Sequence, residues 1–136
     1  MKTYLSAGAA LAAYLVLAWV TGSLLHLESG RFMIQKCGKC GAFVFYPRLF
    51  CTACGAGELA WHEAAGRGTV YSTTVVRRKP DQGGDYNVAL IELAEGPRLM
   101  SRVVDLPPAE VAIGMPVRAA IDQTASGPLL VFRKSK

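Results

Sequence analysis

The sequence predicts a mainly β protein that begins with an apolar α-helix, continues with a four-cysteine module and ends with a small closed barrel. Three observations support this prediction. Residues 7–25 contain no charged side chain and are dominated by alanine and leucine. All four cysteines lie in two close pairs between Cys37 and Cys54. From Gly66 onward, short runs of β-branched and aromatic residues alternate with segments rich in glycine and proline, as in strands joined by turns.

The length and charge of the chain set the limits of the interpretation. The 136 residues suffice for one compact domain or for two small modules that share a core. We expect an apolar helix over residues 1–29, a zinc ribbon over 30–56, a connector over 57–66 and a barrel over 67–136. The formal net charge of +5 suits anionic partners such as nucleic acid, anionic lipid or a phosphorylated cofactor. Because the basic residues are dispersed, a solvated basic surface is the simpler interpretation.

The apolar run over residues 7–25 is close to the ~20 residues that a helix needs to cross a bilayer. Gly30 is a candidate for the C-terminal cap of this helix. A helix that is apolar nearly all round must be covered by lipid or by protein. A membrane anchor and a helix buried against a partner enzyme fit about equally well. For an anchor, the basic residues that follow the run place the remaining modules in the cytoplasm. A cleaved signal peptide fits least, because it would carry four thiols into an oxidising compartment.

The cysteine spacing is Cys37-x2-Cys40, ten residues, then Cys51-x2-Cys54, with a glycine after each pair. Two intervening residues let both sulfurs of a tight turn point at one ion, and the glycine relieves crowding where the backbone folds around that ion. Two such turns supply four thiolates, which is the ligand set of a tetrahedral structural zinc site. Such a site has no vacant position, so we expect the zinc to hold a fixed shape and to perform no catalysis.

Other uses of the four cysteines rank lower. Iron in a rubredoxin-like site has the same ligand set and stays open as an alternative. Two disulfides would need an oxidising compartment, and paired Cys-x2-Cys turns are poorly suited to joining distant segments. A thioredoxin-like redox centre would need only one pair, in a βαβ setting that the sequence does not offer.

The barrel prediction rests on the number and length of the strands. One helical turn at most is expected, in LPPAEVAIG, and a breaker-rich loop, KPDQGGDY, follows the first strand. Five short strands with one interposed helical turn favour a closed barrel over βαβ units. A Greek-key barrel of the OB type fits this count and length. The expected strands are GTVYSTTVVRR, NVALIEL, RLMSRVV, MPVRAAID and PLLVFR.

The chain resembles a family of zinc-ribbon plus OB-fold proteins known as the domain-of-unknown-function-35 family. The similarity runs from about Gly30 to Arg133. Its most specific feature is the order in which the motifs follow one another along the chain. The metal turns alone are widespread, but their succession by GRGTVYS, ALIELAEGPRLMSRVV and IGMPV is much more selective. Family members usually carry a polar helical arm before the GRFMIQKC-like strand, and here the apolar run replaces it.

The resemblance implies a function. Members of that family accompany thiolase-superfamily enzymes, namely thiolases, hydroxymethylglutaryl-CoA synthases, acyltransferases and steroid side-chain aldolases, and some are fused to acyl-CoA hydratase domains. It therefore implies a non-catalytic subunit that docks on such an enzyme and helps to organise the handling of acyl-CoA. Carried onto this chain, it implies that the barrel begins near Gly68 and that the metal ligands are Cys37, Cys40, Cys51 and Cys54.

A candidate site for the CoA phosphates lies in the loop between the first two expected barrel strands. OB folds often bind ligands through that loop. Arg77, Arg78 and Lys79 could meet phosphate groups through charge-assisted hydrogen bonds. An exposed flexible loop is the simpler interpretation of the same residues.

Independent catalysis and nucleic-acid binding are the two other functions that the sequence could suggest. Independent catalysis is not expected, because His26 and His62 lie outside the barrel strands and no nucleophile-elbow motif is present. The alternative from another class is a nucleic-acid-binding zinc-ribbon and OB protein. OB folds that bind single strands usually expose several aromatic side chains on one face, and here the barrel strands carry few.

Overall fold

The computed structural model describes residues 26–136, so the expected apolar helix lies outside the described residues except for its end. Residues 26–28 are helical. The helix ends in a Schellman motif, in which the Gly30 N–H donates to the Leu27 carbonyl (3.0 Å) and the Arg31 N–H donates to the His26 carbonyl (2.9 Å). Gly30 has a φ of 75°, which confirms it as the cap. Among the described residues, no helix has the length and apolar character needed to span a bilayer.

A three-stranded antiparallel sheet follows the helix end. Its strands are β1 (Met33–Cys37), β2 (Phe43–Val44) and β3 (Leu59–Glu63), in the order β2-β1-β3. The strand β3 lies inside the segment 57–66, where we expected a connector, and pairs with β1 along its whole length. Its composition does not predict a strand. All five of its side chains are exposed or half-buried, so the segment lacks the buried apolar residues that mark a strand in the sequence. The pairing with β1 satisfies its backbone, and the ribbon therefore extends to β3.

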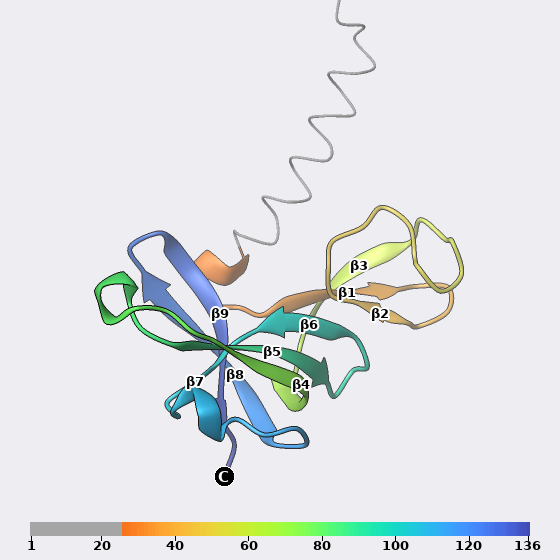
Figure 1. Ribbon diagram of the computed structural model, residues 1–136. Coiled ribbons are helices and arrows are strands. Elements are labelled where there is room, and N and C mark those ends of the chain that lie inside the picture. The colour runs from red at the N-terminus through yellow and green to blue at the C-terminus, as the bar shows by residue number, and fades with distance from the viewer. Residues whose placement is uncertain (1–25) are drawn as a thin grey trace, which may run out of the picture.

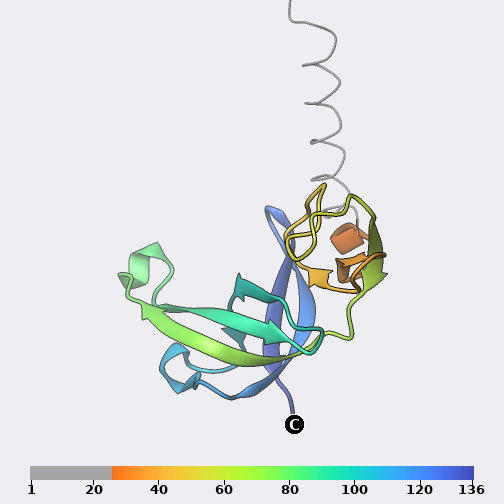
Figure 2. The ribbon, with the colours of Figure 1, turned by 90° about the vertical axis from the view of Figure 1, so that its right-hand side faces the viewer.

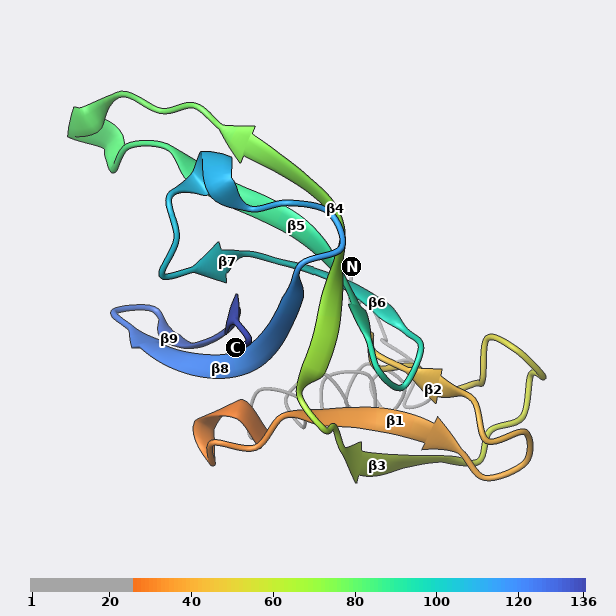
Figure 3. The same ribbon diagram turned by 90° about the horizontal axis from the view of Figure 1, so that it is seen from below.

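The rest of the chain forms a barrel of six strands and two short 3-10 helices, η1 (Pro80–Gln82) and η2 (Pro108–Glu110). The strand order is β6-β5-β4-β8-β9-β7, and all pairs are antiparallel except β7 with β9. The two end strands, β6 and β7, follow one another in the chain, and the parallel pairing of β7 with β9 thereby closes the sheet into a barrel (Figure 3). The strands are β4 (Arg67–Val76), β5 (Tyr86–Leu93), β6 (Arg98–Ser101), β7 (Val103–Val104), β8 (Pro116–Thr124) and β9 (Gly127–Lys134).

Strands β6 and β7 correspond to one expected strand, RLMSRVV, which is interrupted at Arg102. Before the interruption the segment pairs with β5, and after it the segment pairs with β9. At the interruption the Arg102 carbonyl accepts the Phe132 N–H at 2.9 Å. The barrel thus has the five chain segments that the sequence predicts, with one segment shared between two neighbours.

The ribbon and the barrel share one hydrophobic core. Phe32 and Ile34, at the start of the ribbon, belong to the same buried cluster as Val70, Ile91 and Phe132 of the barrel. Figure 1 shows the ribbon beside the barrel, joined to it through β1 and the segment between β3 and β4. The loop between β4 and β5 projects on the side away from the ribbon (Figures 1 and 2). The basic residues of that loop are therefore remote from the cysteines.

Candidate metal centre and neighbouring surfaces

The four cysteines form one cluster at the outer end of the ribbon. Their sulfur atoms all lie within 4.8 Å of one another. The Cys37 and Cys54 sulfurs are 3.7 Å apart, and those of Cys40 and Cys51 are 3.6 Å apart. Four sulfurs around a zinc ion at about 2.3 Å would be ~3.8 Å from each other. A disulfide bond would need about 2.05 Å. The geometry is that of a metal cage and not of two disulfides.

The two Cys-x2-Cys turns, which we call knuckles, have the same local structure. In each, the first cysteine N–H donates to the carbonyl of the alanine five residues later, and its own carbonyl accepts the N–H of the intervening glycine. These glycines, Gly41 and Gly55, both have a φ of 73°. Other residues adopt that conformation only with strain, so both glycines are needed for the turn. Each knuckle provides one buried cysteine and one exposed cysteine.

A buried glutamine fixes the segment between the knuckles. Gln35 of β1 is fully buried. Its side-chain amide donates to the Arg48 carbonyl at 3.1 Å, and its side-chain oxygen accepts the Arg48 N–H at 2.7 Å. Both backbone groups of Arg48 are thus bonded to a side chain instead of to a neighbouring strand, and this fixes the segment that leads to the second knuckle. Gln35 is a functional residue beyond those predicted from the sequence, although a polar residue at an inward position of a strand is a usable signal.

Backbone N–H groups lower the pKa of two of the cysteines and so favour the thiolate form that binds a cation. The N–H groups of Cys54 and Ala53 point at the Cys51 sulfur and lower the pKa of Cys51 to about 7. The Cys40 N–H likewise lowers the pKa of Cys37. At Cys40, the Ala42 N–H lowers the pKa, but the neighbouring sulfurs of Cys54 and Cys51, together with burial, raise it to about 12. Four sulfurs this close cannot all be thiolates without a positive charge among them, and a divalent metal ion supplies that charge.

The basic loop is held by its own contacts. Arg77 forms an ion pair with Asp85 at 2.5 Å, and the other oxygen of Asp85 accepts the Arg78 N–H at 2.9 Å. The Arg78 guanidinium lies over the Tyr86 ring, 5.0 Å from its centroid. Lys79 precedes η1 and makes no side-chain capping bond. The three residues are brought together on one exposed loop, and their contact with CoA phosphates stays a prediction.

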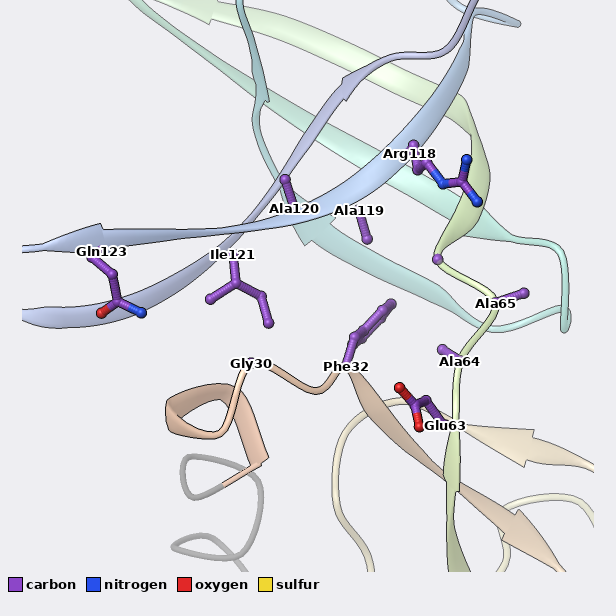
Figure 4. A pocket seen from close by; sticks show the side chains of 11 residues that line it. Gly30, Phe32, Glu63, Ala64, Ala65, Arg118, Ala119, Ala120, Ile121 and Gln123 are labelled. Carbon is purple, nitrogen blue, oxygen red and sulfur yellow. The ribbon is translucent and has the colours of Figure 1, made fainter.

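A groove of about 430 Å³ lies where the ribbon meets the barrel (Figure 4). Phe32 points into it from the ribbon, and Arg118, Ala119 and Ile121 line it from β8. His26 packs against Trp61 and His62 against Phe43, and neither histidine lines this groove. Apart from alanines and glycines, the groove is lined by two apolar side chains, Phe32 and Ile121, and by three polar ones, Glu63, Arg118 and Gln123, so no nucleophile is paired with a base in it.

Residues 26–60 match the family described as "ChsH2, rubredoxin-like zinc ribbon domain", and residues 61–122 match "ChsH2, C-terminal OB-fold domain". Over 105 residues the chain is 36% identical to a "DUF35 domain-containing scaffold protein" of Methanocaldococcus jannaschii, and the match covers 74% of each chain. The chain belongs to the DUF35 family. This confirms the resemblance that the sequence analysis identified.

Two other similar proteins carry names that bear on function. The chain is 40% identical over 89 residues to the "Probable enoyl-CoA hydratase alpha subunit" of Thermomonospora curvata, which covers 64% of this chain and 28% of that protein. The chain thus spans little more than a quarter of the length of that relative. Among solved structures, a chain of the "Ltp2-ChsH2(DUF35) aldolase" superposes with a TM-score of 0.73 at 34% identity, covering 84% of this chain and 92% of that chain.

Proposed function

We propose that this DUF35 protein is the scaffold subunit of an acyl-CoA-processing complex and docks on a thiolase-superfamily enzyme. The observation that carries the proposal is the superposition on nearly the full length of a chain from the Ltp2-ChsH2(DUF35) aldolase. The similarity to a protein named as an enoyl-CoA hydratase subunit also supports a role with acyl-CoA substrates. The reaction and the acyl group are set by the partner enzyme, and the chain itself is non-catalytic.

The metal of the cage is zinc, bound by Cys37, Cys40, Cys51 and Cys54, with rubredoxin-like iron as the alternative. Four sulfur ligands leave no coordination position for substrate or water, so the ion stabilises the ribbon and takes no part in the reaction. The support for this assignment is the sulfur spacing, which matches the edges of a tetrahedral site.

The proposal places the protein in the cytoplasm, where thiolates remain reduced and acyl-CoA esters are processed. In the complex, Arg77, Arg78 and Lys79 contact the phosphates of acyl-CoA that the partner binds. Replacing all three by alanine should weaken CoA binding by the complex without changing its assembly. Isothermal titration with CoA measures this effect, and an unchanged affinity would contradict the assignment of the loop.

Co-expression with the thiolase-superfamily enzyme of the same organism tests the central proposal. We expect the two chains to elute together in size-exclusion chromatography and to give a single sedimenting species. The metal content should be one zinc ion per chain. Independent elution of the two proteins, combined with salt-sensitive binding of single-stranded oligonucleotides by this chain, would instead favour the nucleic-acid-binding alternative.

A further inference from the structure

We propose that the partner enzyme docks on an apolar patch that spans the ribbon and the barrel and that it supplies a carboxylate to Arg102. The inference rests on the proposed function and adds to it the surface and the chemistry of the contact. We call this surface the Met100 patch. It consists of Tyr46, Leu90, Met100, Arg102 and Leu129.

Met100 lies at the centre of this patch. It is the cross-strand partner of Leu90 on the outer face of β5 and β6. Its backbone N–H approaches the Tyr46 hydroxyl of the ribbon at 3.5 Å. Met100 and Leu129 line one groove of about 320 Å³ between β6 and β9. Three segments far apart in the sequence therefore meet around one methionine.

The patch is more apolar than the outer face of a barrel should be. In an antiparallel sheet with one solvated face, the outward side chains are mostly polar. Here the exposed fractions are 64% for Met100, 51% for Tyr46, 40% for Leu129 and 38% for Leu90. Tyrosine, methionine and arginine are enriched at protein interfaces relative to other surface. An exposed cluster of apolar side chains with this composition is typical of a docking site for protein.

Arg102 gives the patch its charge. It lies in the same groove as Met100, and its Nε is buried without a hydrogen-bond partner among residues 26–136. The ion pairs among residues 26–136 that involve arginine use other arginines, namely Arg31, Arg77, Arg98 and Arg133. Its backbone is fixed where the segment changes partners, because the Arg102 carbonyl accepts the Phe132 N–H.

A partly buried guanidinium needs an anion once the surrounding surface is covered. Covering Met100 and Leu129 with protein removes the water that solvates Arg102, and an unpaired charge in such a place is costly. A carboxylate can accept two parallel hydrogen bonds from a guanidinium and would offset that cost. The partner surface should therefore present apolar side chains around one aspartate or glutamate.

Apolar contact is tested by Met100→Asp, with Ile113→Asp as the matched control. Ile113 is more exposed than Met100 and lies outside the Met100 patch, in the turn before β8. We expect Met100→Asp to raise the dissociation constant for the co-expressed thiolase-superfamily enzyme roughly 30-fold or more, as at interface hot spots. Ile113→Asp should change it less than about threefold. Equal effects of the two substitutions would overturn the proposal.

The role of the charge is tested by Arg102→Leu and Arg102→Lys, with Arg67→Leu as a control for an exposed arginine elsewhere. Leucine would suit an apolar groove, so a purely apolar contact predicts unchanged or tighter binding. A carboxylate partner predicts binding weaker by roughly 30-fold for leucine and only partial recovery of the affinity with lysine, which keeps the charge but cannot donate the two parallel hydrogen bonds. If Arg102→Leu is insoluble, Arg102→Gln makes the same comparison. Wild-type affinity of the uncharged variant would refute the carboxylate.

Two failures can be told apart. If the wild-type chain does not bind the enzyme, both the proposed function and this inference fail. If the wild-type chain binds and the Met100 patch variants bind equally well, only the inference fails. Sedimentation of the chain alone adds another outcome, because a self-associated wild type that becomes monomeric in Met100→Asp, with enzyme binding unchanged, would assign the patch to a second copy of the chain.

Discussion

Each knuckle has one exposed cysteine, Cys40 in the first and Cys54 in the second, and yet these two residues complete the cluster of four sulfurs. Burial therefore does not determine their contribution. What matters is the direction that the glycine turns give to each sulfur. The residues between the two cysteines of a knuckle are exposed as well.

Replacing Cys40 by serine should abolish stable metal binding, because a hydroxyl is a poor substitute for a thiolate at a four-sulfur site. We expect the zinc content to fall from one ion per chain to far below one. Elemental analysis after dialysis against a chelator measures this. The control is Thr52→Ala, at an exposed position between the two cysteines of the second knuckle, and this variant should keep its zinc. Full retention of zinc by the serine variant would contradict the cage.

Asp85 gives the basic loop a pH-dependent anchor. The Arg78 N–H and the Arg77 guanidinium lower the pKa of Asp85 below its ordinary value. A carboxyl whose pKa is lowered by folding stabilises the fold above its unfolded pKa of about 3.9, and this contribution is lost as the pH falls through the lower folded value. Between pH 6 and pH 3, the wild type should lose more stability than Asp85→Asn.

Urea unfolding at several pH values measures this difference. Zinc release in acid affects both chains alike, so the difference between them isolates the carboxyl. Parallel curves for the wild type and Asp85→Asn would show that the ion pair contributes nothing to the stability of the fold.

At the scale of the elements, Gly68 of β4 lies where β5 leaves no room for a side chain. A Cβ atom at Gly68 would lie 2.7 Å from a methyl carbon of Ile91 and 2.9 Å from the Glu92 carbonyl oxygen. Its φ is not in the left-handed region, so the constraint is steric. Gly68→Ala should lower the free energy of unfolding by about 1–3 kcal/mol. Gly57→Ala, whose Cβ would meet nothing nearer than 3.6 Å, is the matched control in denaturant titrations.

The sequence predicted the elements where local pattern and structure agree. β-branched runs between glycine turns predicted β4, β5, β8 and β9. It did not predict β3, because Leu59–Glu63 contains alanine, histidine and glutamate and becomes a strand only through its pairing with β1. It also did not predict the break at Arg102, which arises because one segment changes partners from β5 to β9.

The site shows the same division. The spacing of the cysteines was sufficient to predict the cage, since the sulfur geometry is set within two short turns. The contact of Arg77 with Asp85 forms within one loop, but its geometry is set by the conformation of that loop and not by residue type alone. The meeting of Tyr46 with Met100 joins segments that are distant in sequence, and it depends on the packing of the ribbon on the barrel, which no local pattern predicts.

At the scale of the whole molecule, the shared core couples the metal to the barrel. Phe32 and Ile34 are held by the ribbon and packed in the barrel core. Removing zinc with a chelator should therefore lower the melting temperature of the barrel, and we expect a decrease of about 10 °C or more. Differential scanning calorimetry with and without chelator measures it. A barrel transition that does not respond to the chelator would show that the two modules are independent.

The parallel pair of β7 with β9 has a consequence for biosynthesis. The cysteines and the three strands of the ribbon are all complete by Glu63, so a nascent chain can acquire its metal early in translation. The barrel cannot close until Gly127–Lys134 leaves the ribosome, because β9 is the partner of both β7 and β8. Until then, Phe32 and Ile34 lack part of their cover, and the emerging subunit exposes apolar surface that chaperones recognise.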